Sequence, residues 1–101
     1  MTIQSEQLDA NSVVLFLSGR LDTTSAPKFE LELKPFLNGA TDITLDFKNV
    51  SYISSSGLHV LLQTQRAMNL HNRKLVIKNI AEPVRNVFEM TGFINLIKLE
   101  E

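Results

Sequence analysis

The chain contains no cysteine, which excludes disulfide bonds and thiolate metal sites. Its two histidines, His59 and His71, lie twelve positions apart without a third ligand in a recognisable pattern, so we expect no metal site. Glycine is scarce, with four residues, and neither of the glycine-rich motifs that cradle phosphates occurs. We therefore expect no bound cofactor.

Long apolar runs are also missing, and no stretch approaches the roughly 20 apolar residues that a membrane span needs. The first residues show neither the basic nor the apolar region of a signal peptide. The ten basic residues are scattered and the net charge is −1, whereas a nucleic-acid partner requires a concentrated basic face. These absences predict a cytoplasmic protein without direct contact to membranes or nucleic acids.

What is present fits one compact domain over residues 1–101, with 44% hydrophobic and 21% charged residues. Apolar residues alternate or run continuously where strands are expected, and they recur at helical spacing between the strands. The patterns predict strands over 3–8, 13–17, 41–50 and 75–77, helices over 26–37, 58–70 and 82–91, and a last strand or extended tail over 93–99.

The order of these elements, β-β-α-β-α-β-α-β, favours parallel strands joined by helical crossovers, with the first two strands paired directly across a short connection. The run over 13–17 is apolar throughout, which is typical of a strand covered on both faces. Gly39 and Gly92 are placed to end helices. We predict an α/β fold, a mixed sheet of four to five strands with three helices packed on it.

The apolar stripe of the second predicted helix indicates which of its residues face the sheet. Residues at helical spacing on one side of this helix are expected to be buried. The stripe consists of Leu58, Leu61, Leu62, Gln65 and Met68.

Three serines, Ser54, Ser55 and Ser56, follow a predicted strand and precede this helix. The simplest interpretation is helix capping, because serine is a favoured N-cap residue. A second interpretation is a phosphorylation switch, since a phosphate at a helix start is stabilised by the helix dipole and adds about −1.5 to −2 charge. On these residues alone, capping is the better-supported interpretation.

A third interpretation makes Ser55 a catalytic nucleophile, which needs a base and an orienting carboxylate nearby. His59 lies four residues further along the same helix, and we expect it to point away from a hydroxyl at the cap. The serines also do not fit the Gly-x-Ser-x-Gly elbow of serine hydrolases. The sequence therefore argues against an enzyme.

A second polar segment, Asp22 to Thr24, follows the second predicted strand and is explained most simply by capping of the first helix. If the second and third strands are parallel neighbours, Asp22 and Thr23 lie at the same end of the sheet as the serines. Ligands and partners of such sheets meet the loops at the carboxyl ends of the strands. The two segments are therefore expected to form one surface.

Three segments together point to a known family. Residues 17–22 read Leu-Ser-Gly-Arg-Leu-Asp, residues 45–58 end in Ser-Ser-Ser-Gly-Leu, and residues 83–93 hold a helical pattern with a glycine stop. In this order and separation they resemble the STAS domain of bacterial anti-sigma factor antagonists, whose signature is Asp-Ser-Ser/Thr-Gly-Leu. The resemblance covers nearly all 101 residues.

The resemblance implies a partner switch. The unphosphorylated protein would bind an anti-sigma factor that is a serine kinase of the histidine-kinase-like ATPase type, and so release a sigma factor. Phosphorylation at Ser55 would separate the pair, and a PP2C-type serine phosphatase would reverse the change. The residues expected to bind the partner are Asp22, Thr23, Ser54, Ser55, Ser56, Gly57, Leu58 and His59.

One position departs from the family signature, because Ser54 stands where the family has an acidic residue. That departure motivates an alternative function within the same fold. The alternative is a binding or scaffold subunit of a sensory or lipid-transport complex that is never phosphorylated.

Overall fold

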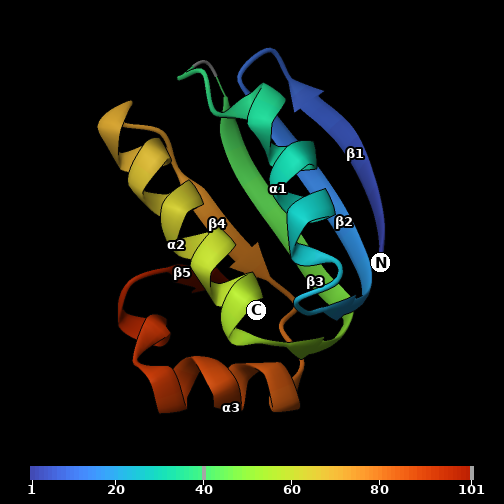
Figure 1. Ribbon diagram of the computed structural model, residues 1–101. Helices are drawn as coiled ribbons and strands as arrows, with labels where there is room; N and C mark the ends of the chain where they lie inside the picture. The colour runs from blue at the N-terminus through green and yellow to red at the C-terminus, as the bar shows by residue number, and fades with distance from the viewer. Residues whose placement is uncertain (40, 101) are drawn as a thin grey trace.

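The computed structural model describes residues 1–39 and 41–100 of the chain. Five strands form one sheet in the order β1-β2-β3-β4-β5, and the helices alternate with the strands after β2 (Figure 1). The elements are β1 (Thr2–Asp9), β2 (Ser12–Leu21), α1 (Ala26–Leu33), the 3₁₀ turn η1 (Lys34–Phe36), β3 (Asp42–Ile53), α2 (Ser55–Leu70), β4 (Leu75–Lys78), α3 (Glu82–Thr91), the 3₁₀ turn η2 (Phe93–Asn95) and β5 (Lys98–Glu100).

The sheet is mixed, as the element order predicts. β1 and β2 pair antiparallel, because two residues are enough to connect them as a hairpin. The pairs β2–β3, β3–β4 and β4–β5 are parallel, and each crosses over through a helix. The predicted α/β fold with three helices is confirmed, and the carboxyl ends of β2 and β3 meet at one edge of the sheet.

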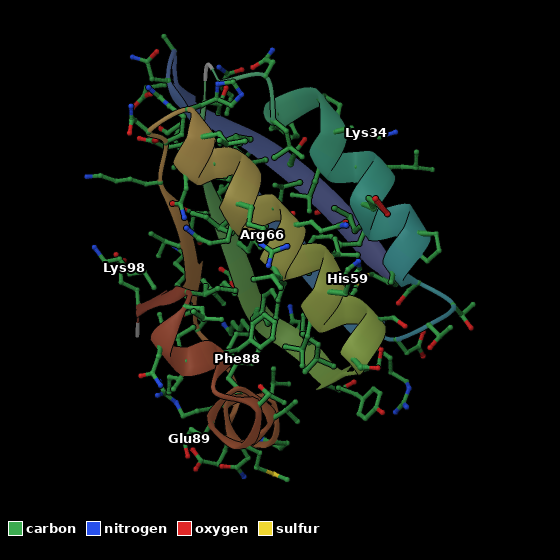
Figure 2. The ribbon with its side chains drawn as sticks, turned by 60° about the vertical axis from the view of Figure 1, so that its left-hand side comes forward. Lys34, His59, Arg66, Phe88, Glu89 and Lys98 are labelled. Carbon is green, nitrogen blue, oxygen red and sulfur yellow. The ribbon has the colours of Figure 1, made fainter. Side chains whose placement is uncertain are left out.

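A single hydrophobic core lies between the helices and one face of the sheet. α1 and α2 lie side by side over this face, and α3 packs across its lower end (Figure 1). α1 buries Phe29 and Leu33 completely. α3 directs Phe88 toward the sheet, where its ring meets Phe47 edge to face at 6.5 Å between centroids (Figure 2). Such aromatic pairs add to the stabilisation that burial supplies.

The prediction that the run over 13–17 is covered on both faces fails at Phe16. Val13, Leu15 and Leu17 face the core and are buried, and on the other face Val14 is 3% exposed while Phe16 is 39% exposed. The side chains of a strand alternate between the two faces of its sheet. Because the three helices contribute their buried residues to one core, the opposite face carries no helix among the described residues.

The predicted helix over 26–37 is shorter than expected. α1 ends at Leu33 and continues as the 3₁₀ turn η1, because Pro35 lacks the N–H that a further α-helical turn would use. Gly39 and Gly92 both have positive φ, +92° and +81°, as their predicted role in ending helices requires. After Gly92 the chain forms η2 rather than a strand, so the predicted strand over 93–99 shortens to β5.

The buried stripe of α2 also differs from the predicted one. Val60 and Thr64 are 5% and 2% exposed, whereas Leu62 and Gln65 are half-buried. The reason is that α2 contacts α1 as well as the sheet, which adds a buried strip on the side of α1. The Thr64 hydroxyl donates to the carbonyl of Val60 at 2.8 Å, which satisfies the one polar group of that strip.

Candidate functional site

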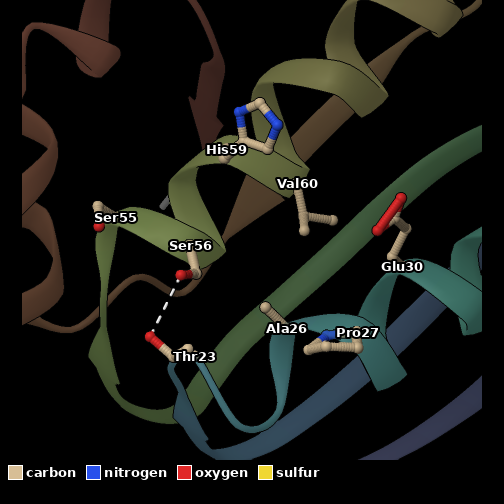
Figure 3. A pocket seen from close by; sticks show the side chains of 8 residues that line it. All are labelled: Thr23, Ala26, Pro27, Glu30, Ser55, Ser56, His59 and Val60. Atoms are coloured by element: carbon tan, nitrogen blue, oxygen red, sulfur yellow. Dashed lines mark hydrogen bonds between the residues drawn. The ribbon is translucent and has the colours of Figure 1, made fainter.

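The loops after β2 and β3 meet as expected. Leu21 and Ile53, the last residues of these strands, are paired, and the Ser54 N–H donates to the Leu21 carbonyl at 2.9 Å. The hydroxyl oxygens of Thr23 and Ser56 lie 3.2 Å apart, within hydrogen-bond distance (Figure 3). The segments that the sequence placed at one end of the sheet therefore form one surface.

The three serines have three different roles at the start of α2. Ser54 is the N-cap with extended backbone, and its hydroxyl accepts a hydrogen bond from the Gly57 N–H at 3.4 Å. Ser55 and Ser56 are the first two residues of the helix. The Ser56 hydroxyl is engaged with Thr23. The exposed Ser55 hydroxyl makes no hydrogen bond with any residue in the described part of the chain.

Gly57 is buried beneath the serines, and Leu58 is 5% exposed at the wall of the smaller of two hollows described below. A Cβ added at Gly57 would lie 2.7 Å from Cγ of Leu21 and 3.0 Å from Cγ1 of Ile53. The absence of a side chain therefore lets the first turn of α2 pack directly against the ends of β2 and β3. Gly57 therefore supports the surface from below, whereas Leu58 contributes to one of its hollows.

Asp22 organises the loop before α1 and does not cap the helix through its side chain. One of its carboxylate oxygens accepts hydrogen bonds from the N–H groups of Thr24 and Ser25, each at 3.1 Å. The N-cap residue is Ser25, which makes no side-chain capping bond and instead donates to the Arg20 carbonyl at 2.6 Å. The expected capping by residues 22–24 is thus replaced by a hydrogen-bonded turn.

Hydrogen bonding also affects the ionisation of Asp22. The backbone N–H of Ser25, the largest contribution, and that of Thr24 hold the pKa of its carboxyl below the usual range, against a smaller opposing effect of burial. The Arg20 guanidinium, 3.6 Å away, lowers the pKa further. The same guanidinium lies 4.1 Å from the centre of the Tyr52 ring, in a cation–π arrangement.

Two hollows flank the start of α2, and Ser55 and His59 line both. The larger, of about 500 Å³, lies between α1 and α2 (Figure 3) and is lined by Thr23, Ala26, Pro27, Glu30, Ser55, Ser56, His59 and Val60. The smaller, of about 310 Å³, is lined by Ser55, Leu58, His59, Leu62, Thr91 and Phe93. Ser55 therefore stands on a ridge with a shallow depression on either side, a shape suited to contact with a protein partner.

The described structure does not pair the Ser55 hydroxyl with a base. Ser55 and His59 share both hollows, yet no hydrogen bond joins them in the described structure. His59 also lacks a carboxylate partner within hydrogen-bond or ion-pair distance among the described residues. A serine nucleophile requires a base that is itself oriented by a third group.

Two other features are absent from the described ranges, 1–39 and 41–100. No group of three or more histidine or acidic side chains is placed to hold a metal ion there. Within the same ranges, no helix is both long and apolar enough to cross a membrane.

Comparison with known proteins places the chain in a family. The family model of the STAS domain matches residues 2–101. The chain belongs to the STAS domain family. A curated relative is the anti-sigma-B factor antagonist of Staphylococcus aureus strain NCTC 8325, which is 33% identical over 86 residues covering 84% of this chain and 80% of the relative.

Solved structures share the fold of this STAS domain at low sequence identity. A putative anti-sigma factor antagonist from Thermotoga maritima superposes with a TM-score of 0.90 at 22% identity, covering 98% of this chain and 86% of that one. The unphosphorylated anti-sigma factor antagonist SpoIIAA gives 0.84 at 22% identity, covering 99% and 89%. Phosphorylated SpoIIAA from Bacillus gives 0.76 at 22% identity, covering 99% and 92%.

The sequence did not reveal the residues that the other elements bring to this surface. Glu30 and Pro27 come from α1, and Thr91 and Phe93 come from the end of α3 and from η2. Their spacing along the chain carries no signal, because they meet the start of α2 through tertiary packing. Glu30 carries the one acidic side chain among the residues that line the two hollows.

Proposed function

We propose that this STAS domain is an anti-sigma factor antagonist controlled by reversible phosphorylation at Ser55. In the unphosphorylated state it binds an anti-sigma factor that is also a serine kinase, and this releases a sigma factor for transcription. The curated relative named above is an antagonist of this kind by name, and SpoIIAA occurs in both unphosphorylated and phosphorylated forms.

The observation that carries the assignment to Ser55 is the difference between the three hydroxyls. The Ser54 hydroxyl accepts the capping bond of α2, and the Ser56 hydroxyl pairs with Thr23. The Ser55 hydroxyl is exposed and has no hydrogen-bond partner in the described structure. A kinase can engage it without first breaking a structural bond, so it is the acceptor that costs least to use.

The chemistry needs no catalytic group from this chain. The Ser55 hydroxyl oxygen attacks the γ-phosphorus of ATP held by the kinase, the bond to the bridging oxygen breaks, and ADP leaves while the hydroxyl proton passes to a base of the kinase. A PP2C-type phosphatase restores the hydroxyl through attack of water on phosphorus, with release of phosphate. The STAS domain is thus a substrate and a binding partner, not an enzyme. Because ATP drives the cycle, we place it in the cytoplasm.

The phosphate acts on the partner interface through charge. It adds about −1.5 to −2 charge to the ridge between the two hollows. A partner that fits the ridge in the unphosphorylated state must then desolvate this charge or meet it with a cation. The partner surface consists of Thr23, Ser55, Ser56 and His59, with Asp22 and Ser54 holding its two loops in place.

Ser54 keeps the structural role that an acidic residue could fill at the same position, because serine and aspartate are both favoured N-caps. The departure from the family signature therefore removes a negative charge beside the acceptor and leaves the local fold intact. This change affects which kinase recognises the site rather than whether the hydroxyl is available.

The experiment incubates the protein with its cognate anti-sigma factor kinase, magnesium and ATP, and the phosphosites are mapped by mass spectrometry. We expect one phosphate per chain, lost in Ser55→Ala and retained in the matched controls Ser54→Ala and Ser56→Ala. Stoichiometric labelling of Ser55→Ala would overturn the assignment to Ser55.

A second candidate is the scaffold subunit that the charge loss at Ser54 motivates. The same experiment separates the two. Tight binding of a partner with no phosphate incorporated at any of the three serines is the result that favours the scaffold.

A further inference from the structure

Ser55 and His59 lie on successive turns of α2 and line the same two hollows, the larger of which is drawn in Figure 3. Residues four apart on a helix are surface neighbours, with their Cβ atoms about 5–6 Å apart. Both side chains are exposed, and neither makes a hydrogen bond or an ion pair with any residue that the structure describes. Two polar side chains are thus adjacent and unengaged at the centre of the proposed partner surface.

The charges around His59 are few. In the hollow between α1 and α2, Glu30 from α1 is the other ionisable acid or base among the lining residues. In the second hollow, α3 and η2 contribute Thr91 and Phe93, which carry no charge. No ion pair joins His59 to the Glu30 carboxylate in the described structure.

A phosphate on Ser55 would change this balance. It brings up to two negative charges and several acceptor oxygens to within one helical turn of the imidazole. A protonated ring donates an N–H to such an oxygen, and charge-assisted hydrogen bonds of this type are stronger than neutral ones. The flexible phosphoserine side chain needs no backbone movement to reach along the helix.

We propose that His59 is the intramolecular counter-charge of a phosphate on Ser55, which makes the phosphorylated state sensitive to pH. The inference deepens the proposed function and rests on Ser55 carrying the phosphate. His59 acts here as a positioning residue, since it holds the phosphate along α2 and takes no part in phosphoryl transfer. Binding of the partner then depends on both the phosphate and the protonation state of His59.

The direction of the pH dependence follows from the two titrations. An unpaired histidine is protonated below about pH 6.5, and the phosphate is largely dianionic above about pH 6. Pairing shifts protonation of the ring to higher pH. The stability that the pair adds to the phosphorylated protein is therefore present near pH 6.5. It is lost as the pH rises toward pH 8, through the raised protonation midpoint of the His59 ring.

The test places phosphoserine at position 55 by genetic encoding, so that no kinase is needed. The ring signals of His59 and His71 are followed by NMR against pH in the phosphorylated and unphosphorylated proteins. We expect the protonation midpoint of His59 to rise on the order of half a pH unit, because a dianion roughly doubles the effect of a single-charge pair four residues apart.

His71 is the internal control. His71 lies at the other end of the 16-residue helix α2, about 24 Å from Ser55 at 1.5 Å per residue. Its protonation midpoint should therefore stay unchanged when Ser55 is phosphorylated. Equal shifts at the two histidines, or no shift at His59, would overturn the proposal.

Two variants separate pairing from other causes. His59→Gln keeps a polar side chain of similar size at an exposed position, and we expect it to abolish the gain in Tm of the phosphorylated protein between pH 8 and pH 6.5. Glu30→Gln removes the acidic neighbour, and the phosphate-dependent shift of His59 should persist. Loss of that shift in Glu30→Gln would assign the effect to Glu30 and contradict the proposal. Failure of a kinase to label Ser55 would refute the proposed function without altering these NMR results.

Discussion

Gly57 connects the start of α2 to the ends of two strands, and Gly57→Ala tests how tightly they pack. The added Cβ would lie 2.7 Å from Cγ of Leu21 and 3.0 Å from Cγ1 of Ile53, distances that packed structures do not tolerate without movement. Leu21 is fully buried and Ile53 is 2% exposed, so neither can move into solvent. We therefore expect the substitution to destabilise the domain.

The expected change in the free energy of unfolding of Gly57→Ala is the difference between two opposing effects. Overpacking a buried site costs about 1–3 kcal/mol. Replacing glycine by alanine inside a helix contributes about 1 kcal/mol in the opposite direction. We expect a net loss of roughly 1 kcal/mol in the free energy of unfolding, measured by urea denaturation, and a fall in Tm of about 4–8 °C.

A double-mutant cycle provides the control for Gly57→Ala. Leu21→Ala removes two of the three atoms nearest to the new Cβ and leaves Cγ1 of Ile53 at 3.0 Å, at a cost of about 2–5 kcal/mol of its own. In the Leu21→Ala background, Gly57→Ala should cost less than in the wild-type background, because the contact at 2.7 Å is gone while the gain in helix propensity remains. If the single variant Gly57→Ala, with Leu21 in place, were more stable than the wild type, the packing argument would be refuted.

Three further predictions concern the same end of the sheet and its open face. Asp22→Asn should lower the urea midpoint at neutral pH, and the difference should vanish as the pH falls through the depressed pKa of the Asp22 carboxyl, below about 3.9, because the ionised form is the one that the loop stabilises. Ser54→Ala should cost about 1 kcal/mol in the free energy of unfolding while Ser54→Asp retains the cap, and equal losses in the two would contradict the capping role. Leu15→Ala should cost about 2–5 kcal/mol, whereas Phe16→Ser on the open face should cost far less, as thermal unfolding can show.

Much of the fold could be predicted because the periodic patterns were local. The order of strands and helices, the parallel pairing and the helix ends at Gly39 and Gly92 follow from residues close together in the chain. The exposure of Phe16 and the burial of Val60 could not be predicted. They depend on all three helices packing on one face of the sheet and on the contact between α1 and α2, which no short segment specifies.

Part of the candidate site could also be predicted from the sequence, and part could not. That the Asp22 loop and the serines share one surface followed from parallel pairing of their strands. Which serine hydroxyl remains free did not, because that depends on the backbone of Ser54 and on Thr23, more than thirty residues away. The hydrogen-bonded turn at Asp22 was hidden for a related reason, since capping and turn formation use the same residue types.

The most direct test of the switch compares binding of the unphosphorylated protein and of the protein with phosphoserine at position 55 to the kinase, by calorimetry at constant salt. We predict that the phosphate weakens binding at least about tenfold, which corresponds to 1.4 kcal/mol, and that Ser55→Ala binds as tightly as the unphosphorylated wild type. Equal affinity of the phosphorylated and unphosphorylated proteins would contradict the account, because Ser55 would then carry a phosphate without acting as a switch.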